Sequence, residues 1–160
     1  MFYLLTFGFL ISMVAIDQVI KFAIVKNLQP ILIYELIPGF IRLRYVENSG
    51  AVFGSFSGSV VILTIFSSII VVITLYLLIA KRIKSKYVSI CLLLMASGGV
   101  GNLVDRIRLG YVIDYLEPTF INFAVFNFAD CLITVGACLL IVYLIKDFAN
   151  DIKKQKQGKA

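Results

Sequence analysis

The sequence contains no histidine and few charged residues. Without histidine, the chain cannot form Ser-His or Cys-His nucleophile pairs or the usual zinc sites, and it lacks the commonest general base. Only 15% of its 160 residues are charged, whereas 61% are hydrophobic and the mean hydropathy is +0.99. Soluble globular proteins are about half apolar and a quarter charged. A soluble two-domain enzyme is therefore excluded, an integral membrane protein is indicated, and any catalysis must use carboxylates, lysine or hydroxyls.

The cysteines are too few, and odd in number, for a disulfide framework. The three of them lie in apolar runs and are typical of small buried hydrophobic residues: Cys91, Cys131 and Cys138. With neither histidine nor a cysteine cluster in the sequence, we expect no metal site.

Apolar runs predict an all-α polytopic membrane protein, because a helix needs about 20 apolar residues to cross a hydrocarbon core about 30 Å thick. The run from Val60 to Ala80 carries no charge. The first and last runs are shorter, so their helices must include Asp17 and Asp130 to span. The N-terminal run lacks a basic flank and a small-residue cleavage site, so we expect it to be retained. The four predicted transmembrane helices lie at about residues 2–20, 60–80, 87–106 and 128–146 of a single membrane domain, 1–160.

The charge distribution predicts the orientation, because Lys and Arg in short loops stay on the cytoplasmic side. Nine of the 15 basic residues lie in two clusters, 81–86 and 146–159, and an even number of spans puts both clusters on one side. Both termini are then cytoplasmic. The net charge of +6 is explained by this topology, so we expect no nucleic-acid partner.

The segment 28–58 is predicted to be a folded insertion on the outer face. Ile41, Leu43 and Tyr45 alternate with two arginines, which is typical of a strand with one buried face, and the aromatic spacing in 51–56 indicates a short interfacial helix. The tail 147–160 is Lys-rich, and we interpret it as frayed and solvated.

With this topology, the unusual polar residues gather at one depth near the outer face: Asp17, Lys21, Asn102, Asp105, Arg106, Asn127 and Asp130, with Asp114 in the loop between the last two helices. Ionisable groups in membrane spans are costly and are functional candidates. Asp17 and Lys21 are four residues apart and can pair. They form either a surface ion pair of small energy or a support for a site. Glu35, Glu47 and Glu117 are interpreted as solvated loop residues.

Asp114 and Asp130 are the candidates for chemistry. Two nearby carboxylates cannot both ionise, so they share a proton, and such a pair supplies a base for water and an acid for the substrate. The pair titrates as a unit, so the sequence does not assign the two roles. The structural alternative for Asp130 is an N-cap of the last helix.

Four blocks of the sequence resemble the bacterial lipoprotein signal peptidases (signal peptidase II), which are aspartic intramembrane peptidases. In the family's order, the blocks are Asp17-Gln18-Val19-Ile20-Lys21, Asn48-Ser49-Gly50-Ala51-Val52-Phe53-Gly54, Gly98-Gly99-Val100-Gly101-Asn102-Leu103-Val104-Asp105-Arg106 continuing to Asp114, and Phe126-Asn127-Phe128-Ala129-Asp130. Small departures at Ile20, Val52 and Tyr115 remove no polar position.

The resemblance implies a fold of four transmembrane helices with a small extracytoplasmic β-cradle and a short interfacial helix. It implies Asp114 and Asp130 as the catalytic pair, with the site shaped or supported by Asp17, Lys21, Asn48, Gly98, Asn102, Arg106, Asn127 and Ala129. No cofactor is needed.

The resemblance also implies the reaction, its location and the partners. The enzyme would remove the signal peptide from a diacylglyceryl-modified prolipoprotein, cutting just before the lipid-modified cysteine, near the outer face of the bacterial cytoplasmic membrane. Membrane lipid and globomycin-type lipopeptide inhibitors are the other implied partners, and the expected state is a monomer.

Three other functions fit parts of the pattern. A transporter or channel subunit would distribute polar residues through the membrane depth, whereas here they gather at one end. A phospholipid transferase would place acids on the cytoplasmic side, which is basic here. A Ser-Lys peptidase could use Lys21 with Ser49 or Ser55 if the lysine were unpaired.

Overall fold

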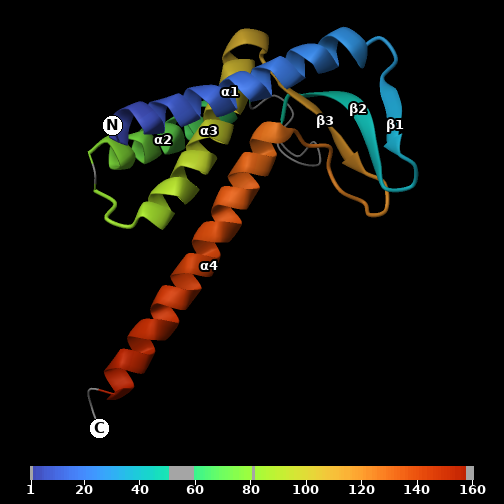
Figure 1. Cartoon of the computed structure of the whole chain (residues 1–160). Helices are drawn as coiled ribbons and strands as arrows, with labels where there is room; N and C mark the ends of the chain where they lie inside the picture. The colour runs from blue at the N-terminus through green and yellow to red at the C-terminus, as the bar shows by residue number, and fades with distance from the viewer. Residues whose placement is uncertain (1, 51–59, 81, 158–160) are drawn as a thin grey trace.

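The computed structural model describes residues 2–50, 60–80 and 82–157. Four helices and three strands follow one another as α1 (Phe2–Asn27), β1 (Ile33–Ile37), β2 (Ile41–Asn48), α2 (Val60–Ile79), α3 (Lys86–Leu109), β3 (Val112–Pro118) and α4 (Phe128–Gln157). α3 packs against each of the other three helices, most extensively against α4. Figure 1 shows the sheet at one end of the helix group and the C-terminal part of α4 extending beyond the other helices. The interfacial helix predicted for 51–56 lies outside the described residues.

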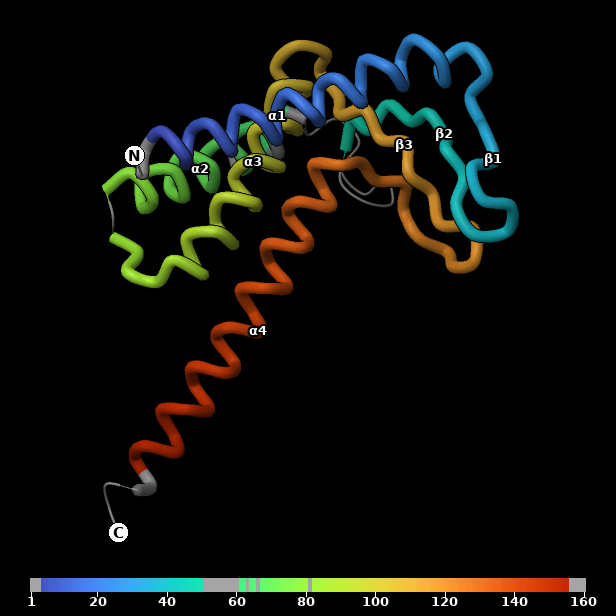
Figure 2. The backbone as a smooth tube through the Cα atoms, in the orientation of Figure 1, coloured from blue at the N-terminus to red at the C-terminus, as the bar shows by residue number. Residues whose placement is uncertain are grey.

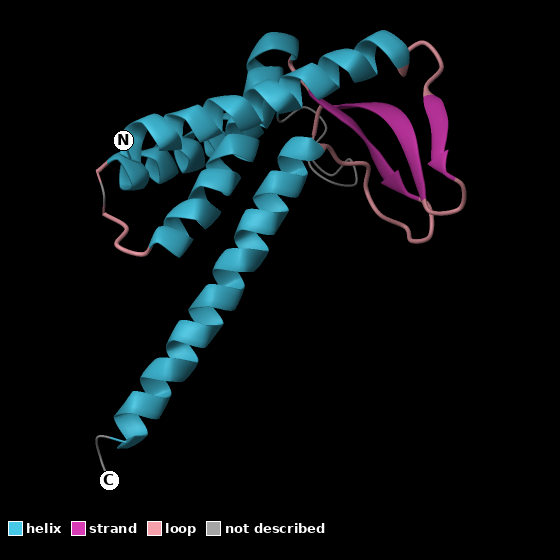
Figure 3. Ribbon diagram, viewed as in Figure 1, coloured by secondary structure: helices cyan, strands magenta, loops and turns pink. Residues whose placement is uncertain are grey.

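Three of these helices, α1, α3 and α4, are long and apolar enough to cross a membrane. α2 contributes a shorter described apolar stretch, Ser67–Ile79. The molecule is thus a mostly helical membrane protein with a small sheet, and Figure 3 separates the two parts by colour.

Two helices extend beyond their predicted ends. α1 continues past Lys21 to Asn27 because the lysine is buried against other helices instead of marking the headgroup region. The frayed tail predicted for 147–160 is wrong over most of its length, because α4 continues to Gln157. At about 1.5 Å per residue, its 30 residues exceed the thickness of the hydrocarbon core.

The three strands form one antiparallel sheet in the order β1-β2-β3. The strand predicted around 41–45 is confirmed as β2, while β1 and β3 were not predicted. Asp114 was placed in a loop by the sequence, but it lies on β3 opposite Val46 of β2. Glu35 and Glu47 are exposed, as predicted, and Glu117 is half-buried, but all three lie on strands and not in loops.

Glu117 shows why its strand position matters. Arg42 Nε and Nη2 donate to its two oxygens at 2.6 and 3.0 Å, and Arg44 Nη1 lies 3.3 Å away. Hydrogen bonds from Arg42 lower the pKa of this carboxyl. The pairs tie β2 to β3 at the end of the sheet distant from Asp114.

A left-handed glycine returns the chain from α3 to the sheet. Gly110 ends α3 with φ at 80°, and its N–H donates to Arg106 O at 3.1 Å. Only glycine adopts this conformation without steric cost. The turn lets β3 begin at Val112, beside the end of α3.

The cysteines, all among the described residues, are free. Cys91 is buried, as predicted, but Cys138 is exposed on α4. The prediction of burial fails there because an apolar run in a membrane helix has a face that packs against nothing in the chain.

Candidate functional site

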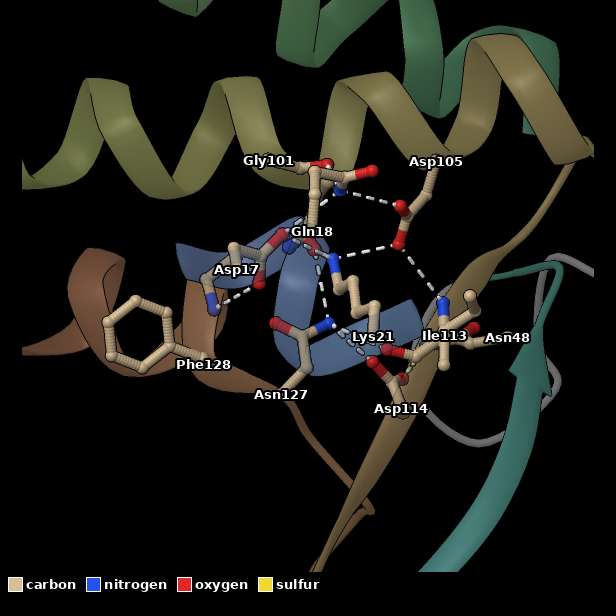
Figure 4. Close-up of polar contacts among 12 residues, drawn as sticks. Asp17, Gln18, Lys21, Asn48, Gly101, Asp105, Ile113, Asp114, Asn127 and Phe128 are labelled. Carbon is tan, nitrogen blue, oxygen red and sulfur yellow. Dashed lines mark hydrogen bonds and ion pairs between the residues drawn. The ribbon is translucent and has the colours of Figure 1, made fainter. Parts of the chain in front are cut away.

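Lys21 of α1 lies at the centre of a buried polar network (Figure 4). Its side chain is only 2% exposed, and Nζ lies 2.9 Å from Asp17 Oδ2 and 2.7 Å from Asp105 Oδ2. The same ammonium donates to Asn102 Oδ1 at 3.0 Å. A lysine has three hydrogens to donate, and each finds an acceptor. The surface-pair alternative for Asp17 and Lys21 is therefore wrong, and Lys21 is not the unpaired base that a Ser-Lys peptidase needs.

Asp17 connects the first helix to the last. Its Oδ1 accepts the backbone N–H of Ala129 at 3.2 Å, in the first turn of α4. Such N–H groups have no partner within their own helix, and the positive end of the helix dipole favours a carboxylate there. Asp17 thus fixes the start of α4, the helix that carries Asp130.

Asp105 of α3 has the corresponding role toward β3. Its Oδ2 accepts the backbone N–H of Ile113 at 3.2 Å, and its Oδ1 accepts Gln18 Nε2 at 2.9 Å. Since Ile113 directly precedes Asp114, this contact holds the strand next to the network.

Asn127 and Asp130 form a reciprocal cap at the start of α4. Asn127 Oδ1 accepts the N–H of Asp130 at 2.9 Å, and Asp130 Oδ2 accepts the N–H of Asn127 at 3.1 Å. This is the capping-box geometry, in which Asn127 is the N-cap and Asp130 stands three positions later. Asp130 is therefore not the N-cap of α4, as the structural alternative proposed. It is the third residue after the N-cap in the same capping motif.

Asp114 receives two amide hydrogen bonds from different elements. Asn127 Nδ2 donates to its Oδ1 at 2.6 Å, and Asn48 Nδ2, at the end of β2, donates to its Oδ2 at 2.8 Å. The carboxyl is 2% exposed. Burial raises the pKa of Asp114 to about 6, and the charge of Asp130 acts in the same direction against the two amides.

Two amides link the two candidate carboxylates. Asn102 Nδ2 donates to Asp130 Oδ1 at 2.8 Å, while Asn127 Nδ2 donates both to Asp114 and to Asn102 Oδ1, the latter at 3.1 Å. The structure therefore brings Asp114 and Asp130 into one hydrogen-bonded cluster, although they come from a strand and a helix.

Gly98 and Ala129 give the site its shape. A Cβ on Gly98 would collide with the backbone oxygen of Ala129, so α3 and α4 approach each other closely at this point. Ala129 is fully buried. A larger residue at either position would push α4, and with it Asp130, away from α3.

Arg106 lies beside the cluster on α3, half-buried. It is near enough to Asp130, Asp114 and Asp105 to interact electrostatically with all three. Among the described residues, no ion pair of 4.0 Å or less joins it to a carboxylate, so its charge acts on the cluster at longer range.

Two residues of the network were missed as site residues by the sequence analysis. Gln18 joins Asp17, Asp105 and the Gly101 carbonyl, and an amide within an apolar helix was an available signal. Tyr115 is buried, and its hydroxyl accepts the N–H of Phe128 at 3.2 Å. No local pattern marks Tyr115, because its role depends on β3 lying against the start of α4.

The described residues contain no group of three or more His, Cys, Asp or Glu side chains that could hold a metal ion. Asp17 and Asp105 share Lys21 instead. The arrangement is suited to acid–base chemistry by a pair of carboxylates, of which Asp114 is buried and Asp130 half-buried.

The family model and the curated relatives identify one family. A family model described as signal peptidase (SPase) II matches residues 9–146. A lipoprotein signal peptidase from Enterococcus faecalis is 39% identical over 158 residues, covering 98% of this chain and 96% of that protein. One from Streptococcus thermophilus is 36% identical over 138 residues, covering 86% and 90%. A solved bacterial membrane enzyme superposes with a TM-score of 0.82 at 29% identity, covering 91% of this chain and 90% of that one.

Proposed function

Because the chain belongs to the signal peptidase II family, whose members cleave signal peptides from prolipoproteins, we propose that Asp114 and Asp130 are its catalytic pair. The observation that carries this proposal is the amide bridge: Asn127 donates to Asp114 and caps the helix turn that holds Asp130. One side chain thereby sets the relative position of both carboxylates. Asp17, Lys21, Asn48, Gly98, Asn102, Arg106 and Ala129 support this arrangement.

The two carboxylates have different surroundings. Asp130 lies in the first turn of α4 and accepts the backbone N–H of Asn127. Asp114 is buried on β3, and burial raises its pKa to about 6. The pair shares one proton, so one carboxylate is ionised and acts as the base while the other is protonated and acts as the acid.

The reaction follows from these two states. The ionised carboxylate takes a proton from a water molecule whose oxygen attacks the scissile carbonyl carbon, while the protonated carboxyl hydrogen-bonds the carbonyl oxygen. The tetrahedral intermediate then collapses, the C–N bond breaks, and a proton passes from the pair to the leaving amine. The products are the signal peptide, with a new carboxylate, and the lipoprotein, with a free amino terminus.

The membrane location determines the substrate. We place α2 as a fourth span, both termini in the cytoplasm, and the site near the outer face of the bacterial cytoplasmic membrane. There, the acyl chains of a diacylglyceryl-modified cysteine hold the preceding peptide bond at the depth of the pair, so lipid binding energy positions the reacting bond. A monomer contains every residue of this site, and a globomycin-type lipopeptide would compete for it.

The test is turnover of a lipid-modified prolipoprotein by purified single variants. Asp114→Asn and Asp130→Asn keep the side-chain shape but remove the base or the shared proton, so each should abolish cleavage while the protein stays folded. Asp147→Asn, at an exposed position on α4, is the matched control and should cleave at the wild-type rate. Near wild-type turnover by either of the first two variants would falsify the proposal, as would loss of wild-type cleavage in a metal chelator.

A further inference from the structure

A cavity lies at the end of the helix group opposite the polar network. It has a volume of about 440 Å³ and is lined by residues of α1, α2, α3 and the loop before α3, among them Thr6, Leu78, Lys84, Lys86 and Ser89. Figure 2 shows the α2–α3 loop and the N-terminal end of α1 at the same end of the molecule. The volume is within the range of small-molecule sites, about 300 to 1,000 Å³.

The cavity lining has an apolar part and a positively charged part. Leu78, Ile83, Ile90 and Leu93 supply an apolar wall, whereas Lys84 and Lys86 supply two cations at the exposed rim. An apolar wall continuous with the surface of membrane helices is suited to an acyl chain, and a pair of lysines at its mouth is suited to a phosphate.

No carboxylate of the neighbouring sequence neutralises these lysines. Residues 48–104, which include α2 and most of α3, contain neither Asp nor Glu, and neither do residues 1–16. Among the described residues, the ion pairs within 4.0 Å do not include Lys84 or Lys86.

Ser89 adds a polar contact inside the cavity. Its hydroxyl hydrogen is donated to the Ser85 carbonyl at 3.0 Å, so its oxygen remains an acceptor. A hydroxyl on the headgroup can donate to this oxygen while the lysines hold the phosphate.

We propose that this cavity binds an anionic phospholipid, with its phosphate at Lys84 and Lys86 and an acyl chain along the apolar wall. The site is separate from the proposed catalytic pair and does not depend on it. On the topology proposed above, the lipid comes from the cytoplasmic leaflet.

The sequence contains no tryptophan, so the fluorescence of a single introduced Trp can be measured without a background from native Trp residues. A single Trp introduced by Ile90→Trp reports lipid occupancy of the cavity through quenching by brominated acyl chains. Ile141→Trp, on the exposed face of α4, reports the ordinary lipid surface. The probes are phosphatidylglycerol and phosphatidylcholine with the same brominated chains.

At Ile90→Trp, phosphatidylglycerol should be preferred over phosphatidylcholine on the order of tenfold, since two lysines each strengthen anionic lipid binding severalfold. At Ile141→Trp, the two lipids should quench within twofold of each other. Adding Lys84→Gln and Lys86→Gln should remove the preference at Ile90→Trp, whereas the control pair Lys153→Gln and Lys154→Gln should retain it.

Three results would overturn the proposal. They are equal quenching by the two lipids at Ile90→Trp, a preference that survives the Lys84→Gln and Lys86→Gln changes, and displacement of the brominated lipid by millimolar glycerol 3-phosphate, which would show a free phosphate site. Wild-type prolipoprotein cleavage by each variant verifies that it is folded, and this check is independent of which lipid quenches.

Discussion

At the scale of single residues, Asn127 has two separable roles. Its side-chain oxygen caps α4, and its side-chain nitrogen bonds to Asp114 and Asn102. Serine is a good N-cap but cannot supply the second contact. Asn127→Ser should therefore keep the cap and lose less stability than a variant without it, while lowering kcat/KM on the order of a hundredfold, similar to the loss of one well-placed donor.

Asn127→Ala is the companion variant, because it loses both roles. It should lose the same activity and be about 1 kcal/mol less stable than Asn127→Ser. Thermal unfolding in detergent and single-substrate kinetics distinguish the two variants. Wild-type kcat/KM in Asn127→Ser would show that the bond to Asp114 is dispensable.

The raised pKa of Asp114 also predicts a pH dependence of stability. The folded state holds this proton up to about pH 6, whereas the unfolded chain releases it near pH 3.8. Its contribution to stability is therefore largest below pH 4 and declines as the pH rises to 6, by at most about 3 kcal/mol. The unfolding midpoint of the wild type, measured relative to Asp114→Asn, should fall across this interval. A constant difference between the two proteins would contradict the buried, proton-holding Asp114.

The sequence identified the polar residues of the cluster but not their contacts. Asp17 and Lys21 illustrate the limit, since their spacing predicted a pair equally well at a surface or in a core. What decides is Asp105, on a helix distant in sequence, which supplies the second carboxylate to the lysine. The catalytic roles of Asp114 and Asp130 stay predictions until the variants are measured.

At the scale of elements, the contact between α3 and α4 sets the position of Asp130. Gly98 has no room for a Cβ against the Ala129 backbone, whereas Gly8 of α1 has nothing within 4 Å. Gly98→Ala should therefore destabilise the protein by about 1–3 kcal/mol and reduce cleavage, because α4 must shift.

Gly8→Ala is the matched control, since it makes the same chemical change in a helix with open space around it. Unfolding midpoints and cleavage rates of the two variants give the comparison. Equal behaviour of Gly98→Ala and Gly8→Ala would show that the close approach does not position Asp130.

The strands show which elements a pattern can predict. β2 alternates apolar and basic residues, so the two-residue period of a strand could be recognised in the sequence. In β3, the first four residues, including Asp114, are all buried, because the strand lies between β2 and the helix ends, and no alternation survives. β1 is exposed throughout, so its apolar residues show no buried face.

At the scale of the whole molecule, the charge distribution predicts the orientation in the membrane. In a background without the native cysteines, an impermeant thiol reagent applied to intact cells should label Glu35→Cys, on the sheet, and should leave Lys84→Cys unlabelled. Lys84→Cys should become reactive after the membrane is permeabilised. Labelling of residue 84 from outside would reverse the topology and place the carboxylate pair on the cytoplasmic side.

The hydrogen bond from Ala129 to Asp17 joins residues 112 positions apart, and this separation has a consequence for biosynthesis. When α1 leaves the ribosome, neither α3 nor α4 exists, so Asp17 and Lys21 can satisfy only each other. Their spacing of four residues lets α1 enter the bilayer without net charge at this depth. Later, α3 brings Asp105 and Asn102 to Lys21, and α4 brings the N–H that occupies Asp17. Because Asp130 lies on α4, the proposed catalytic pair is complete only after this last helix has been inserted.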